Sequence, residues 1–150
     1  MKTRLTRLSA AARMYGLGLC AAAALAACST QTATDNRPPE EIVKQRAAER
    51  WDALLAADYT KAYGYLAPTV RTVKSLEGYK LGLRVVDGKD SPWKKYEIRQ
   101  VSCQEQAQSC KATVAIEAIL SVPKFAGMTA TAEAEEEWIL QDGQWYYYMR

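Results

Sequence analysis

The dipeptide Asp142-Gly143 constrains this chain more than any other feature, because it lies between two segments, 129–140 and 145–149, that have the composition of β-strands. Such a pair favours a two-residue type I′ turn, which joins two antiparallel strands. The turn fixes the strand pairing, so that Trp138 faces Tyr147 and Leu140 faces Trp145 on one side of the sheet. Because that side is apolar, the sequence predicts a hairpin with one buried face.

Two further segments with the two-residue period of β-strands precede this hairpin. In residues 111–122, small and branched apolar side chains occupy alternate positions, which is the most regular alternation in the chain. Cys103 and Cys110 lie at the ends of the loop between the two segments. In an oxidising compartment these thiols should pair and close the loop. Redox catalysis is the alternative, but it usually uses a CxxC motif, with only two residues between the cysteines. The strands expected are 96–104, 111–122, 129–140 and 145–149.

The chain before the sheet has the period of an α-helix. Residues 38–41, Pro-Pro-Glu-Glu, are typical of a helix start, because proline is tolerated in the first turn and acids face the positive end of the helix dipole. Between residues 43 and 55 apolar side chains recur at helical spacing, and Arg50 lies mostly outside this stripe. The segment predicts an amphipathic helix that packs on another element.

Two shorter helices are expected before the first strand. Asp58 can cap a helix that Pro68 ends. Residues 75–84 again have helical spacing. Helices followed by an antiparallel sheet predict an α+β domain with a single core.

The first 27 residues have the chemistry of an export signal. Four basic residues without an acid precede an uncharged run, residues 14–27, that is rich in Ala and Leu. As a helix this run would span about 21 Å, short of the roughly 30 Å of a bilayer core, so a stable membrane span is not expected. Its end, Leu25-Ala26-Ala27-Cys28, resembles the lipobox of bacterial lipoproteins. This resemblance implies cleavage before Cys28 and attachment of acyl chains such as palmitate.

The resemblance to lipoproteins also implies an organisation and an address. We expect a signal peptide at 1–27, a lipidated tether at 28–37 and the α+β domain at 38–150. Ser29 is not the Asp that typically retains a lipoprotein in the inner membrane. A Gram-negative host would therefore carry an outer-membrane lipoprotein facing the periplasm, and another host a cell-membrane anchored protein. The alternative is an ordinary secretory signal with an incidental cysteine.

Composition excludes several classes of function. Of the 20 Lys and Arg residues, four lie in the signal segment, which leaves 16 against 17 Asp and Glu residues. Nucleic-acid binding needs a concentrated basic surface, so no nucleic acid is expected as a partner. The chain has no His, which excludes His-based triads and His metal sites. We expect no cofactor and no metal, because the acidic run at 133–137 lacks the oxygen-rich loop of a calcium site.

Two stretches, WDALLAADYTKAYGYLAP at 51–68 and EWILQDGQWY at 137–146, resemble the nuclear transport factor 2-like superfamily, which includes SnoaL and ketosteroid-isomerase-like domains. The resemblance covers roughly residues 40–150. It implies a cystatin-like cone, in which a curved antiparallel sheet wraps around N-terminal helices and encloses a cavity. Some members are isomerases, dehydratases or cyclases and many only bind or assemble, so the fold does not decide the activity.

A cone of this kind would bring several aromatic side chains toward its interior. An apolar pocket rimmed by phenols would suit a small apolar ligand. Aromatic side chains also fill ordinary cores, which is the alternative. The candidates for lining the pocket are Trp51, Tyr63, Trp138, Trp145 and Tyr147.

Glu136 is the one carboxylate that the hairpin register places on the apolar side. Burial there would favour its neutral form and could make it a proton carrier. Glu136 and Tyr63 are therefore the candidates for catalysis by analogy with the isomerases, although the isomerase positions do not match residue by residue. A place near water at the end of a strand is the alternative, and no catalytic residue is assigned.

The other side of the last hairpin carries a second group of aromatic residues. Exposed aromatics on a sheet face commonly mark an interface, so Ile139, Tyr146 and Tyr148 are candidates for a homodimer contact. We expect a non-catalytic, membrane-anchored envelope lipoprotein that binds a small apolar ligand or a protein partner. The alternatives are an isomerase, dehydratase or cyclase acting in the cavity and a structural module of an envelope assembly.

Overall fold

The computed structural model describes residues 35–150 apart from 86–89, 105–107 and 121–122. The predicted signal peptide, the lipobox with Cys28 and most of the tether lie outside the described residues. Within the described part, none of the helices has the length and apolarity needed to cross a bilayer.

Four helices precede the sheet and are explained by their first residues. Helix α1 (Pro39–Leu55) begins with proline followed by two acids, as predicted. Asp58 caps α2 (Tyr59–Gly64), and its Oδ1 accepts the backbone N–H of Lys61 at 2.9 Å. Ser75 caps α4 in the same way. Helix α2 ends before Pro68, and Pro68 also starts the single turn of α3, which was not predicted and where its missing N–H costs nothing. The last two helices are α3 (Pro68–Arg71) and α4 (Leu76–Gly82).

The four strands form one antiparallel sheet in chain order, β1-β2-β3-β4. At the last turn Asp142 and Gly143 have φ of 51° and 76°, the left-handed conformation that a type I′ turn requires. Trp138 pairs with Tyr147 and Leu140 with Trp145, which confirms the predicted register. The strands are β1 (Trp93–Gln104), β2 (Ser109–Ile119), β3 (Thr129–Gln141) and β4 (Gln144–Tyr148), with a short 3-10 helix η1 (Pro123–Phe125) between β2 and β3.

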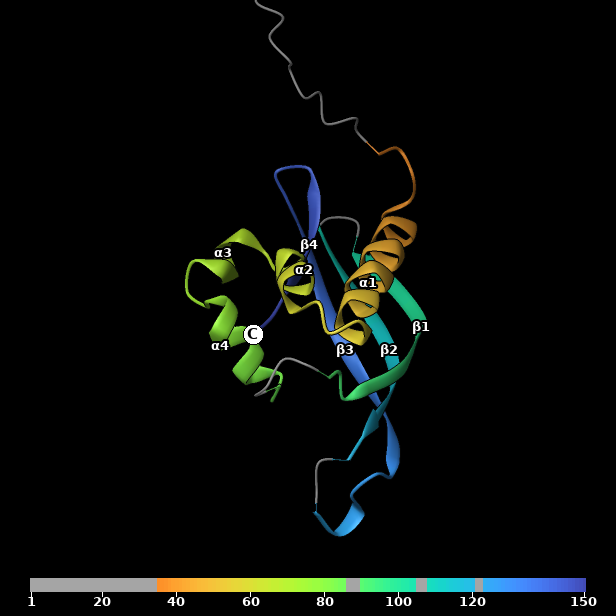
Figure 1. Cartoon of the computed structure of the whole chain (residues 1–150). Coiled ribbons are helices and arrows are strands. Elements are labelled where there is room, and N and C mark those ends of the chain that lie inside the picture. Colours follow the sequence, from red (N-terminus) through yellow and green to blue (C-terminus); the bar gives the residue numbers. More distant parts are fainter. Residues whose placement is uncertain (1–34, 86–89, 105–107, 121–122) are drawn as a thin grey trace, which may run out of the picture. The chain divides into compact units, whose positions relative to one another are not determined.

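Strand β3 is much longer than its partner β4. Strand β4 pairs with β3 only from Glu137 to Gln141. The earlier part of β3, from Thr129 to Glu136, pairs with β2 alone. The β2–β3 hairpin consequently extends beyond the helices, with η1 at its far end (Figure 1).

Helix α1 lies across one face of the sheet over β1 and β2 (Figure 1). Its first half packs Val43 and Ala47 against Cys110, Trp138 and Trp145. Its second half packs against α2, α4 and the middle of β2, in a larger cluster. The fully buried members of that cluster include Leu54, Leu66, Tyr79 and Val114.

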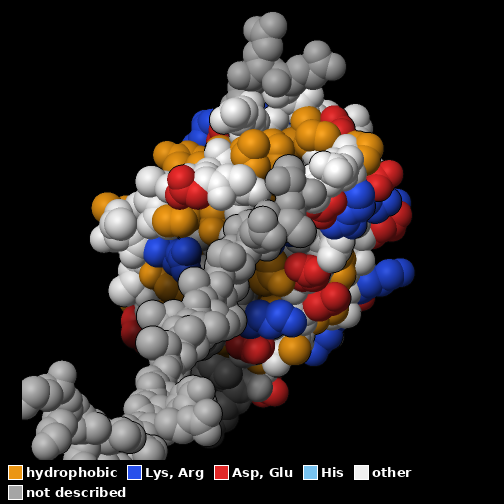
Figure 2. Space-filling view, turned by 90° about the horizontal axis from the view of Figure 1, so that it is seen from above, with side chains coloured by type: hydrophobic (Ala, Val, Ile, Leu, Met, Phe, Trp, Pro, Cys, Tyr) orange, Lys and Arg blue, Asp and Glu red, His pale blue; other side chains and the backbone are white. Residues whose placement is uncertain are grey.

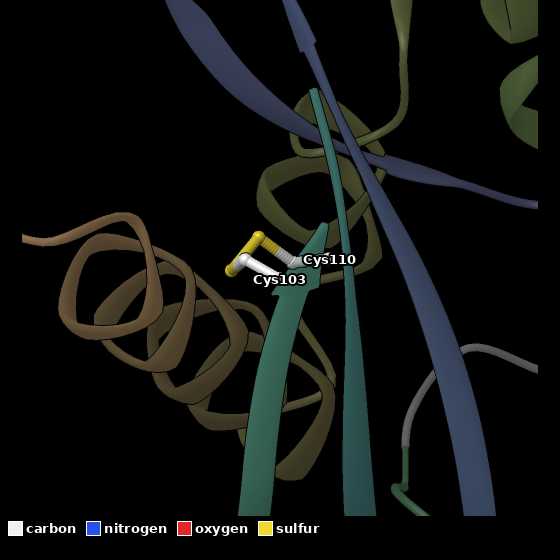
Figure 3. The surroundings of a disulfide bond; sticks show 2 residues. All are labelled: Cys103 and Cys110. Carbon is white, nitrogen blue, oxygen red and sulfur yellow. A yellow bond between two sulfur atoms is a disulfide. The ribbon is translucent and has the colours of Figure 1, made fainter. Parts of the chain in front are cut away.

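A disulfide joins Cys103 and Cys110, which face each other across β1 and β2. Its sulfur atoms lie on the side of the sheet that carries α1 (Figure 3). Cys110 is only 1% exposed and belongs to the cluster around the first half of α1. The bond therefore ties the β1–β2 hairpin together beneath the helix.

The prediction of a cone around a cavity was wrong. The sheet has four strands, and large side chains fill the space between it and the helices. Trp51, Tyr79 and Trp138 are at most 4% exposed in this layer. Because these rings pack into the two core clusters between the helices and the sheet, they occupy the volume that a cone would leave open.

Candidate functional site

The aromatic residues proposed for a pocket pack into the core instead of facing one another across a space. Trp51 stacks on Tyr96 with ring centroids 6.1 Å apart. Trp138 lies 6.0 Å from Tyr147 by the same measure. Trp145 is buried beside Trp138, and Tyr63 packs at the edge of the other cluster. A ligand-binding role for these residues stays a prediction.

Glu136 is buried, and its carboxylate accepts hydrogen bonds from three side chains. It is 3% exposed, and α1 supplies two of its partners. Arg50 donates Nη1–H to Oε1 at 2.5 Å, and Trp51 donates Nε1–H to the same oxygen at 2.8 Å. From its own strand, Trp138 donates Nε1–H to Oε2 at 3.1 Å. Both carboxylate oxygens are therefore already occupied by donors.

Arg50 completes this cluster as the cation that neutralises Glu136. Its guanidinium lies 4.1 Å from the centre of the Tyr147 ring, and Nη2 donates to the Tyr79 hydroxyl at 3.4 Å. Burial acts to lower the pKa of Arg50, but the opposing charge of Glu136 and the two tyrosine hydroxyls raise it overall. Burial also raises the pKa of Tyr79 and Tyr147. The cluster is therefore one ion pair surrounded by phenols whose pKa is raised.

The structure does not bring Tyr63 to Glu136. The Tyr63 hydroxyl donates to the backbone carbonyl of Lys74 at 2.7 Å, just after α3. Its ring lies 5.8 Å from that of Tyr79, which reaches the ion pair in its place. The pair that was considered for catalysis thus has no shared hydrogen-bond partner, and its catalytic role stays a prediction.

Sequence reasoning missed Arg50 and Tyr79. Arg50 lies mostly outside the apolar stripe of α1, so it was assigned no role from the sequence. One signal was present in the sequence: a carboxylate on a buried strand face requires a buried cation, because an unpaired charge is too costly to bury. That rule would have directed attention to the basic residues of α1.

The interface candidates are less exposed than the alternation of the hairpin suggested. Ile139 and Tyr146 are half-buried, and Tyr148 is 37% exposed. The guanidinium of Arg46 covers one side of Tyr146, at 5.7 Å from the centre of its ring. Dimerisation through this face stays a prediction.

A surface cleft of about 390 Å³ opens beside β3 at the point where β4 stops pairing with it. It mixes acidic, basic and apolar groups, as does the surface in Figure 2, where Lys and Arg are interspersed with Asp and Glu. No set of three or more carboxylate or thiol side chains in the described residues could hold a metal ion. The cleft is lined by Lys111, Glu135, Glu136, Glu137, Tyr147, Met149 and Arg150.

The chain is similar to known proteins in its fold. No family model matches it, and no curated protein matches it. The fold is similar to that of solved SEC-C motif containing proteins. A solution structure of one from Rhodopseudomonas palustris has a TM-score of 0.50 and 11% identity, and the match covers 67% of this chain and 70% of that one. A crystal structure of another, from Psychrobacter arcticus, has a TM-score of 0.54 and 8% identity. That match covers 76% of this chain and 63% of the other chain.

These neighbours overturn the family resemblance. The similar structures are SEC-C motif containing proteins and not nuclear transport factor 2-like or SnoaL domains, so that prediction was wrong. The stretches at 51–68 and 137–146 form a helix pair and a hairpin, local units that recur in many α+β folds. The comparisons likewise give no support to the lipoprotein and signal-peptide resemblance, whose residues lie outside the described part.

Proposed function

We propose that this protein is a non-catalytic binding module whose partner is another protein. One observation carries the proposal: Glu136, the one acid buried in the described residues, is fully engaged by Arg50, Trp51 and Trp138. A role for Glu136 as a general acid or base would need a carboxylate free to exchange protons with a substrate. Here the carboxylate holds helix α1 to β3.

The packing of the interior favours a protein partner over a small apolar ligand. The aromatic rings that would line a pocket contact one another, as Trp138 does with Tyr147 and Trp51 with Tyr96. A ligand in the interior would have to displace these rings and open a close-packed core. Binding at the surface requires no such change.

The proposal includes a place at a membrane. It is supported by the sequence alone, through the basic and apolar residues that precede Cys28. Acyl chains on one sulfur would hold the domain at the membrane surface, at roughly 0.8 kcal/mol per buried methylene. A Cys28→Ser variant of the full chain should then be found in the soluble periplasmic fraction of a Gram-negative host. Mass spectrometry of the membrane-bound protein should give an acylated N-terminal Cys28, and a mature chain without fatty acids would refute the anchoring.

The absence of an internal site is tested separately. The full chain is screened against small apolar molecules by thermal shift, and candidates are counted by native mass spectrometry. We expect no compound that binds with one-to-one stoichiometry and raises the melting temperature of the protein in a saturable way. A compound that does so, and that fails to bind after Trp138→Phe or Tyr147→Phe, would overturn the proposal in favour of an internal ligand.

A further inference from the structure

We propose that the free edge of β3, from Thr129 to Glu136, binds an extended segment of a partner protein by adding it to the sheet as a further strand. The inference rests on the proposed function, because it names the surface and the chemistry of that partner. On one side this stretch pairs with β2, and β4 pairs with β3 only from Glu137 onward. Among the described residues, the backbone groups on its other side have no strand beside them.

Among the described residues, this edge lacks several of the features by which proteins usually block such pairing. Natural edges are protected by lysine or other charges, by proline, by a bulge or by a covering element. The charges on this edge are all negative, so they repel an acidic strand and attract a basic one. From Thr129 to Glu136 the sequence contains no Lys, Pro or Gly, and its pairing with β2 continues without a register shift. Residues 129–133 are all exposed, on a hairpin that extends beyond the helices (Figure 1). The cleft of about 390 Å³ lies at the end of this edge, beside Glu135 and Glu136.

One face of the edge selects apolar side chains. Ala130, Ala132 and Ala134 lie on the side of the sheet that carries α1, next to Ala118, Ile116 and Val114 of β2. Val114 is fully buried there, so this face continues the core outward. Alanine leaves room above the edge, and large apolar side chains of an added strand would fill it and bury apolar area.

The other face selects basic side chains. Glu133 and Glu135 point to the solvent side, and both are exposed. Lys111 Nζ lies 4.0 Å from Glu135 Oε2 with both side chains largely exposed, an arrangement worth little, and Arg150 pairs with Glu137 instead. Lysine or arginine opposite these carboxylates would pair with them across the strands. The preferred partner is therefore an extended segment in which apolar and basic residues alternate.

The test uses the full chain and a short synthetic peptide of alternating valine and lysine, with affinity measured by calorimetry. A peptide with glutamate in place of lysine and a peptide N-methylated along one edge are the comparisons. We expect the lysine peptide to bind, to protect the amide groups of residues 129–136 from hydrogen exchange, and to bind at least about tenfold more tightly than either comparison peptide. Because N-methylation removes backbone donors without changing charge, it separates strand addition from simple electrostatic attraction.

Variants of the chain test the same surface. Glu133→Lys with Glu135→Lys should weaken the lysine peptide about tenfold or more and improve binding of the glutamate peptide. The matched control is Glu77→Lys with Glu97→Lys, which changes the net charge equally at exposed positions on α4 and β1. It should leave the affinity within about twofold.

Three outcomes would overturn the inference. The first is that the lysine peptide does not bind, and the second is that N-methylation leaves the affinity of the peptide unchanged. The third is a dimer, detected by light scattering, whose contact protects residues 129–136 from hydrogen exchange, because a second copy of the chain would then occupy the edge. None of these outcomes opens an internal site, so the proposed function would survive the loss of this surface. Conversely, a ligand found in the core by thermal shift would refute the proposed function while peptide binding at the edge could still be measured.

Discussion

Replacing Glu136 with glutamine tests whether the buried ion pair holds helix α1 to the sheet. The side chains of Glu136 and Arg50 are each 3% exposed, and Arg50 Nη1 lies 2.5 Å from Glu136 Oε1. Glutamine keeps the size of the side chain, but it leaves Arg50 as an unpaired buried cation and turns an amide N–H group toward donors that need an acceptor. Removing one member of a buried pair costs about 3–5 kcal/mol. Since a domain is stable by only about 5–15 kcal/mol, the variant should lose a large part of its free energy of unfolding.

Urea unfolding followed by tryptophan fluorescence measures this loss, because Trp51 and Trp138 both donate to Glu136. Glu135→Gln is the matched control on the same strand, and its exposed side chain should change the free energy of unfolding by less than about 0.5 kcal/mol. Adding Arg50→Met to Glu136→Gln should recover part of the loss, because no unpaired charge then remains. A loss below about 1 kcal/mol in Glu136→Gln, or an equal loss in the control, would refute the reasoning.

Three further predictions concern local elements. Replacing both Cys103 and Cys110 with alanine should lower the free energy of unfolding by about 2.5 kcal/mol, the loop-entropy value for a closed loop of this size, in urea titrations without reductant. Asp58→Ala removes the cap of α2 and should cost about 0.5–2 kcal/mol in the same titration, with full retention of stability counting against the cap. Burial and the hydrogen bond to Asp52 raise the pKa of Tyr96 to about 12, above the value of about 10 in an unfolded chain. The folded protein therefore keeps a proton that the unfolded chain loses, so stability should fall as pH rises from about 10 to 12, and urea midpoints across this range should fall less in Tyr96→Phe.

The parts of the fold that depend on neighbouring residues could be predicted from the sequence. Asp142-Gly143 set the register of the last hairpin because a type I′ turn leaves its strands a single pairing. Cys103 and Cys110 pair because the strands on both sides of their loop bring them opposite each other. Pro68 was only half understood, since proline is compatible both with the end of one helix and with the first turn of the next.

The parts that depend on distant contacts could not be predicted in the same way. Helix α1 touches the sheet on one side and α2 on another, so its buried surface is wider than one apolar stripe and includes Arg50. The length of α1 and the alternation of the sheet are compatible with either an open cavity or a filled core. Whether the space between the helices and the sheet is filled depends on whether large rings from different parts of the chain, such as those of Tyr79 and Trp138, are buried in it.

The buried ion pair and the free edge are parts of one arrangement in β3. Pairing with β4 ends at Glu137, and Glu136 is the next residue toward the free stretch. At this point β3 loses a neighbouring strand and gains helix α1, because Arg50 and Trp51 both bind the Glu136 carboxylate. Contacts that fix the strand where lateral pairing stops keep the following edge extended, with Glu133 and Glu135 on its solvent side. A pre-ordered edge loses less conformational entropy when a partner strand is added, so the contacts of Glu136 would favour the proposed binding.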